Sequence, residues 1–218
     1  DENGKISITL EVAEECIQRR AIRYDKNGDN HYDIISAFIK SMRGSDPDAA
    51  VYYLAKMLYG GEDPKFIARR IMICACEDVG NADPQAIQVA VSCALAVERV
   101  GMPESQIILA HAAIYVATAP KSNSVVNAIF SANNAVKQYS NAEVPPYLKD
   151  AHYPGSALLG HVGYKYAHDY EGHITAMTCL PESLQGREYF RPSDNGLEPK
   201  YKERLNQIKA WKKAHRDD

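Results

Sequence analysis

The 218-residue sequence lacks the features of membrane, secreted and strongly charged chains. No run of about 18 apolar residues is present, so we expect no membrane-spanning helix. The five cysteines are odd in number and lack the paired spacing of a zinc site, which favours free thiols and the reducing cytoplasm. With 25 Lys and Arg against 28 Asp and Glu, the composition argues against a wholly basic nucleic-acid-binding module.

Motifs for nucleotide binding and nucleophilic catalysis are also missing from the sequence. Gly4-Lys5 is followed by Ile6 and has no glycine at the upstream position, so it does not match a phosphate-binding loop. No serine or cysteine stands in a nucleophile elbow, and no dinucleotide-binding fingerprint occurs. We therefore expect no catalytic residue, no bound cofactor and no metal ligand in this chain, and no ATP hydrolysis by it alone.

Proline and glycine divide the middle of the chain into helices. Aspartate accepts hydrogen bonds from free amides at a helix N-cap, and proline suits the first helical position. Three apolar-periodic stretches follow such pairs, namely Asp46-Pro47, Asp63-Pro64 and Asp83-Pro84, and Met102-Pro103 begins a fourth. Glycine or proline follows each stretch, which ends a helix. The predicted helices span residues 47–59, 64–79, 84–100 and 103–119.

The spacing of these helices predicts a mainly α fold. Short connections require neighbouring helices to pack antiparallel, so we expect an antiparallel helical bundle. The stretch 107–119 is apolar nearly all round, which is typical of a central helix or of a subunit interface. Its candidates for an oligomer interface are Ile107, Ile108, Ile114 and Tyr115. Further helices are predicted over residues 10–21, 32–42, 124–138 and 198–214.

After Pro145-Pro146 the composition changes to an irregular extension rich in Tyr, His and Gly. A polar cluster in this extension consists of His161, His168, Asp169 and His173. These residue types can ligate a metal or exchange protons near neutral pH. They can equally form a polar network that holds an irregular loop against the bundle, and we favour this second interpretation because spacing alone provides no geometry for a site.

The last predicted helix, 198–214, is basic. Clustered Lys and Arg displace counterions from nucleic acid, although a charged face can also be simply solvated. The candidates for DNA contact are Lys200, Lys202, Arg204, Lys209, Lys212 and Lys213.

Several strings along the chain match one family. The most specific is KSMRGSDPDAA at residues 40–50, and further matches are EDVG at 77–80, APKSN at 119–123 and YKYAHDY at 164–170. Together they resemble the C-terminal region of the replication-associated recombination protein A family (RarA, also MgsA), which is related to the Werner-helicase-interacting ATPases.

The resemblance implies a clamp-loader-type AAA+ ATPase whose ATPase core and helical lid precede this region. A full protein of this kind is expected to be a DNA-dependent ATPase that uses ATP and Mg²⁺ at replication forks, in the nucleoid-associated cytoplasm. Its expected partners are its own copies in a homotetramer, DNA bound through the full-length protein, and replication proteins. Because the Walker A and Walker B motifs belong to the core, no ATP-site residue transfers to this chain.

These patterns predict three parts of the chain. Residues 1–30 are expected to form an N-terminal helix and linker after the AAA+ lid, residues 31–140 an oligomerisation bundle resembling a clamp-loader collar, and residues 141–218 the irregular extension and basic helix. The alternative function is a helical-repeat module that binds a replication partner protein. An independent enzyme built on the histidine cluster ranks last.

Overall fold

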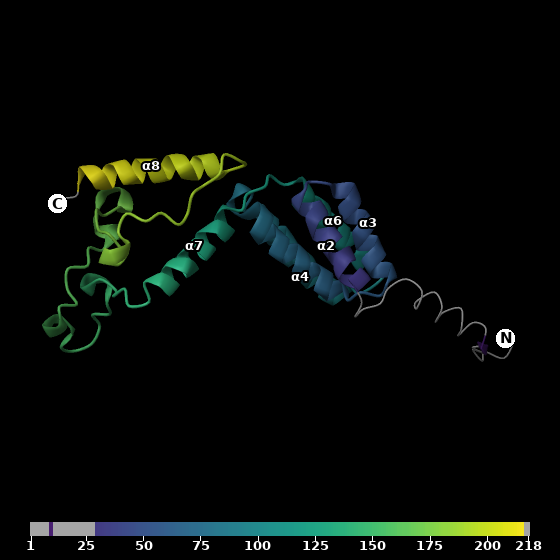
Figure 1. Ribbon diagram of the computed structural model, residues 1–218, viewed down its shortest axis with the longest axis horizontal. Helices are drawn as coiled ribbons and strands as arrows, with labels where there is room; N and C mark the ends of the chain where they lie inside the picture. Colours follow the sequence, from purple (N-terminus) through teal and green to yellow (C-terminus); the bar gives the residue numbers. More distant parts are fainter. Residues whose placement is uncertain (1–8, 11–28, 216–218) are drawn as a thin grey trace. The chain divides into compact units, whose positions relative to one another are not determined.

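A computed structural model describes residues 9–10 and 29–215 of the chain (Figure 1). This part is mainly α and contains no strand, which confirms the predicted fold class. Its helices are all too short or too polar to cross a membrane. The predicted helix over residues 10–21 and nearly all of the predicted linker 1–30 lie outside the described residues.

The contacts divide the chain into two compact units after Ser122. The helix over residues 124–138, which the sequence groups with the bundle, has its contacts in the second unit. The functional boundaries expected at residues 30 and 140 stay predictions.

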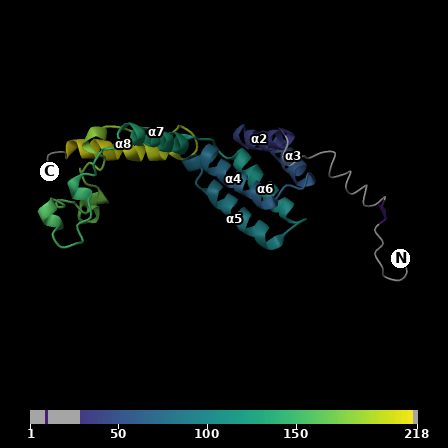
Figure 2. The same cartoon turned by 60° about the horizontal axis from the view of Figure 1, so that its bottom comes forward.

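The first unit is an antiparallel bundle with one helix at its centre. Its helices are α2 (Asp29–Arg43), α3 (Pro47–Tyr59), α4 (Pro64–Cys74), α5 (Gln85–Val100) and α6 (Ser105–Thr118). Figure 2 shows α4, α5 and α6 side by side. Because α6 contacts α2, α3, α4 and α5, it occupies the centre, as its largely apolar sequence predicts. The largest side chains of this core are Phe38, Met42, Met57, Ile67, Ile71 and Leu109.

Aspartate side chains cap the helices as the sequence predicts. Each accepts a hydrogen bond from an amide in the first turn, which stabilises a helix by roughly 1 kcal/mol. The bonds are 2.9 Å for Asp46 to Ala49, 2.9 Å for Asp63 to Lys65 and 3.0 Å for Asp83 to Gln85. The helix predicted from Pro103 begins at Ser105 instead, where the serine hydroxyl donates to the Gly101 carbonyl at 2.7 Å.

A buried carboxylate joins three segments of the first unit, and we call this contact the Asp78 junction. Asp78, which is 7 % exposed, lies in a π-helical turn, Ala75–Val79, that continues α4. Arg43 Nε, at the end of α2, donates to Asp78 Oδ1 at 2.5 Å, and Cys74 Sγ donates to Oδ2 at 3.2 Å. The Ser122 amide donates to the Asp78 carbonyl at 2.8 Å, so the segment after α6 meets the same turn.

Burial and charge at the Asp78 junction shift the pKa values of the groups around it. The hydrogen bond to Asp78 raises the pKa of the Arg43 guanidinium, so this side chain stays charged. Burial raises the pKa of the Cys74 thiol, which therefore stays protonated and able to donate. The ion pair and the thiol donor together satisfy both oxygens of a carboxylate that is costly to bury alone.

Lys121 closes the C-terminal end of α6. Its ammonium donates to the carbonyls of Val116, Ala117 and Ala119 at 2.9, 2.9 and 2.6 Å. The first two of these carbonyls belong to the last turn of the helix, whose carbonyls have no helical partner. Burial lowers the pKa of Lys121.

The second unit contains α7 (Ser124–Gln138) and α8 (Glu198–Ala214), separated by an irregular segment with short 3₁₀ turns. Glu198, at the start of α8, is fully buried. Its two carboxylate oxygens accept from Ser124 Oγ and from the Ser193 amide, each at 2.5 Å. This carboxylate therefore connects the start of α7, the start of α8 and the loop that precedes α8.

Replacing Asp78 by Ala is expected to lower the free energy of unfolding by about 2 kcal/mol, because Arg43 and Cys74 both lose their acceptor. Urea unfolding measures the change. Glu77→Ala is the matched control: Glu77 also pairs with Arg43, at 3.3 Å, but its side chain is 43 % exposed. An exposed ion pair contributes less than about 1 kcal/mol, so equal losses in the two variants would contradict a central role for Asp78.

Replacing Glu198 by Ala is expected to leave Ser124 and Ser193 without this acceptor, at a cost of roughly 1–3 kcal/mol for each buried group. Hydrogen exchange should then become faster in the first turns of both α7 and α8. Glu203→Ala, which removes an exposed carboxylate from the same helix, is the control and should leave exchange unchanged. Unchanged exchange in Glu198→Ala would show that this contact does not hold the two helices.

Candidate functional surfaces

The outer face of α6 carries exposed isoleucines. Ile107 is 68 % exposed and Ile114 is 42 % exposed. The two residues are seven apart, so they lie two turns apart on one face of the helix. On the opposite face Leu109 and Val116 are fully buried in the bundle core. The apolar sequence of α6 therefore serves the core on one side and leaves an apolar surface on the other.

The remaining interface candidates on α6 turn toward neighbouring helices. Ile108 is half-buried and packs against the core. The Tyr115 hydroxyl donates to Asp83 Oδ2 at 2.8 Å, and this bond raises the pKa of Tyr115. Since the other oxygen of Asp83 caps α5, Tyr115 links α6 to the start of α5. Of the four predicted interface residues, the structure thus exposes Ile107 and Ile114, while Ile108 and Tyr115 stabilise the bundle.

A groove of about 530 Å³ runs between α5 and α6. Small side chains line it from α5, among them Ser92, Cys93 and Ala96, and Ile108 and His111 line it from α6. Burial raises the pKa of the Cys93 thiol to about 11, so this cysteine is not a reactive nucleophile.

The basic residues of α8 fall into two groups. In the first group, each lysine ammonium already donates to an acceptor within the second unit, either a carboxylate or a backbone carbonyl. Lys202 pairs with Asp194 at 2.8 Å, Lys209 with Glu188 at 2.6 Å, and Lys212 donates to the Met177 carbonyl at 3.1 Å. The second group is exposed, and its side chains make no hydrogen bond or ion pair within residues 29–215; it consists of Lys200, Arg204 and Lys213.

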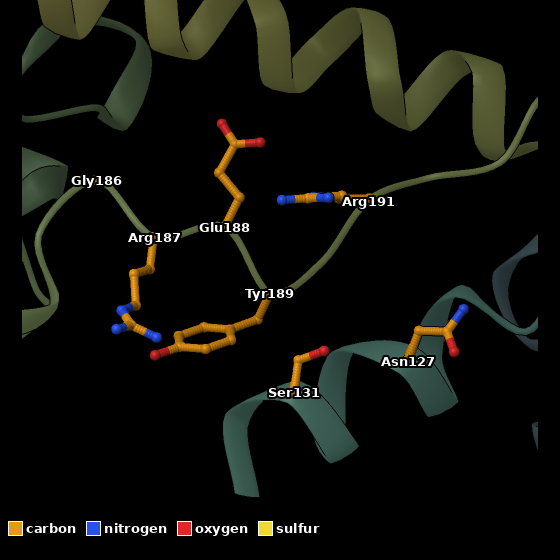
Figure 3. A pocket seen from close by; sticks show the side chains of 7 residues that line it. All are labelled: Asn127, Ser131, Gly186, Arg187, Glu188, Tyr189 and Arg191. Atoms are coloured by element: carbon orange, nitrogen blue, oxygen red, sulfur yellow. The ribbon is translucent and has the colours of Figure 1, made fainter. Parts of the chain in front are cut away.

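A polar pocket of about 590 Å³ lies between α7 and the segment Gly186–Arg191 (Figure 3). Asn127 and Ser131 line it from α7, and Arg191 points across it from the segment. The Arg191 side chain extends toward Glu188 and interacts electrostatically with that carboxylate.

The other charged residues of this pocket already have partners. Arg187 donates to the Tyr139 hydroxyl at 2.7 Å and lies over the Tyr139 ring, 4.6 Å from its centroid. The hydrogen bond from Lys209 to Glu188 lowers the pKa of that carboxylate. No sequence motif indicated Arg187 or Arg191, because both lie in an irregular segment whose contacts are distant in sequence.

The predicted histidine cluster separates into two sets of contacts. The rings of His168 and His173 lie 5.0 Å apart, and Tyr166 lies 5.1 Å from His168. His161 instead contacts the Tyr153 hydroxyl and the Asp150 carbonyl, both at 3.0 Å. Asp169 is exposed in the turn beside His168. Among the described residues, no three His, Cys, Asp or Glu side chains are placed to hold a metal ion.

Comparison with known proteins identifies the family of the chain. The family model described as MgsA AAA+ ATPase C terminal matches residues 44–209, and the one described as AAA C-terminal domain matches residues 1–43. An uncharacterised AAA domain-containing protein of Mycobacterium tuberculosis is 50 % identical over 204 residues, which are 93 % of this chain and 45 % of the relative.

Two further relatives carry the name replication-associated recombination protein A. The Bacillus subtilis protein is 44 % identical over 207 residues, covering 94 % of this chain and 48 % of its own length. The Coxiella burnetii protein is 41 % identical over 218 residues, covering 99 % of this chain and 50 % of its own length. The chain spans about half the length of the curated relatives it matches. It belongs to the family of MgsA C-terminal domains of AAA+ ATPases, among the replication-associated recombination proteins.

Proposed function

We propose that this chain is the assembly domain of a DNA-dependent AAA+ ATPase that maintains replication forks and supports recombination. In this proposal the chain joins four copies into a homotetramer, as a clamp-loader collar does, and so positions four ATPase modules around DNA. ATP and Mg²⁺ bind in the ATPase core of the parent protein. The parent protein is located in the cytoplasm and is associated with the nucleoid. The names of the B. subtilis and C. burnetii relatives support the link to replication and recombination.

The exposed isoleucines of α6 are the observation that carries the proposal. Ile107 and Ile114 leave apolar surface in water on the central helix of the bundle. Full burial of an exposed isoleucine is worth about 1.5–3 kcal/mol, so covering this face with another copy would contribute to the free energy of association. Exposed apolar surface of this kind is typical of interfaces between copies of a chain. Residues 31–140 are the corresponding oligomerisation region.

The basic helix α8 supplies the proposed contact with DNA. Lys200, Arg204 and Lys213 are exposed and have no partner within the described residues, so they are available to phosphates. Lys202, Lys209 and Lys212 would have to exchange their present contacts before they could bind DNA. We therefore propose that the first three contribute more to the affinity of the full-length protein for DNA.

The solution mass of the chain tests the assembly proposal. Sedimentation over a concentration series should give a species near four times 24.2 kDa. The double variant Ile107→Glu, Ile114→Glu should sediment as a monomer, because paired charges in an apolar interface are costly to bury. Both positions are exposed in the single chain, so its circular dichroism should stay helical.

Ile107→Val with Ile114→Val is the matched control and should retain the tetramer, since it keeps the surface apolar. A wild-type chain that stays monomeric at every concentration would overturn the assembly proposal. The groove between α5 and α6 would then favour the alternative, a helical module that binds a replication partner protein.

A further inference from the structure

A second pocket, of about 590 Å³, lies beside the C-terminal end of α8, and we call it the Trp211 pocket. Trp211 lines it from α8 and His215 from the residue after this helix, while Tyr170, Ile174 and Thr175 line it from the irregular segment. Tyr170 is 40 % exposed, and Trp211 and His215 are half-buried. Three aromatic rings, those of Tyr170, Trp211 and His215, therefore line part of this concave surface.

The aromatic wall of the Trp211 pocket is preformed. The Trp211 and His215 rings are stacked, with centroids 4.3 Å apart and an interplanar angle of 14°. A contact of 2.8 Å between His215 Nδ1 and the Trp211 carbonyl fixes the imidazole in this position. A ligand that binds against these rings does not need to order them first, which lowers the entropic cost of binding.

Polar groups of the irregular segment line the same pocket and suit a flat ligand with a hydrogen-bonding edge. Glu171 and Thr175 also line the pocket, and a carboxylate accepts hydrogen bonds while a hydroxyl donates or accepts them. A nucleobase has a flat face that stacks on aromatic rings and an edge that forms hydrogen bonds.

Two basic side chains that make no hydrogen bond or ion pair to a described residue lie along α8 on the N-terminal side of the Trp211 pocket. Arg204 lies seven residues before Trp211, and Lys200 lies eleven residues before it, so all three share one face of the helix. At 1.5 Å per residue these cations lie about 11 and 17 Å from Trp211 along the helix axis. Positive charge thus extends in one direction from an aromatic pocket, as in grooves that bind single strands.

We propose that the Trp211 pocket binds an unpaired base of single-stranded DNA, while Arg204 and Lys200 bind phosphates of the adjoining backbone. Paired bases are stacked inside a duplex and cannot enter such a pocket without leaving the stack. The inference rests on the proposed function, in which the parent protein acts on DNA, and it gives that contact a position and a class of ligand.

Intrinsic fluorescence tests this proposal directly, because Trp211 is the one tryptophan of the chain. Titration with an oligothymidylate of about 10 nucleotides should quench the emission saturably at low salt, since a stacked base lies against the indole or its partner rings. An abasic oligomer of the same length and charge should bind more weakly and cause no quenching. A blunt duplex should likewise leave the emission unchanged.

Substitutions separate base stacking from attraction to phosphate. Trp211→Ala should weaken oligothymidylate binding roughly 5- to 150-fold by fluorescence anisotropy of a labelled oligomer, whereas Trp211→Phe, which keeps a stacking ring and the fold, should weaken it much less. Tyr201→Ala removes another exposed aromatic side chain from α8, outside the pocket, and should have no effect. Arg204→Gln should reduce the slope of log K against log salt by about one.

Equal affinity and equal quenching for the abasic oligomer would overturn the proposal, because binding would then need only phosphate. Absence of oligothymidylate binding at low salt would overturn it as well. The same samples give the solution mass, which keeps the two proposals distinguishable. A tetramer that does not bind the oligomer contradicts the Trp211 pocket alone, and a monomer that binds it with quenching contradicts the assembly proposal alone.

Discussion

The bundle depends on the burial of one carboxylate, Asp78, where segments far apart in the sequence meet. Arg43 comes from the end of α2, and Ser122 from the segment that follows α6. A buried charge of this kind is tolerated only while all its partners are in place, so the junction fixes the ends of these elements together. Three of the strings that mark the family, at residues 40–50, 77–80 and 119–123, meet at this junction.

Local signals predicted most of the helices, and long-range contacts account for the exceptions. The helices over 47–59, 124–138 and 198–214 begin and end where predicted. Capping by a neighbouring aspartate is a short-range interaction, which explains the agreement for α3. The π-helical turn after α4 could not be predicted in this way, because it holds Asp78 in position for Arg43, 35 residues earlier in the chain.

For the candidate surfaces, too, local sequence predicted some features, whereas others depend on contacts between distant residues. An apolar sequence all round α6 predicted either a central helix or an interface, and only the structure separates the buried Leu109 face from the exposed Ile107 face. The two pockets described above in the second unit could not be predicted from the sequence. The segment 139–197 has no periodic pattern, and its contacts, such as Arg187 with Tyr139, join residues 48 positions apart.

The interval between Ile107 and Ile114 equals one heptad, the repeat of a left-handed coiled coil. Helices that pack through such a repeat cross at a shallow angle of about 20°. In an antiparallel pair of α6 helices about a twofold axis, Ile107 of one copy faces Ile114 of the other. The midpoint of that interval falls beside His111, which is exposed. Each imidazole would then lie near the twofold axis of such a pair, close to its own symmetry mate.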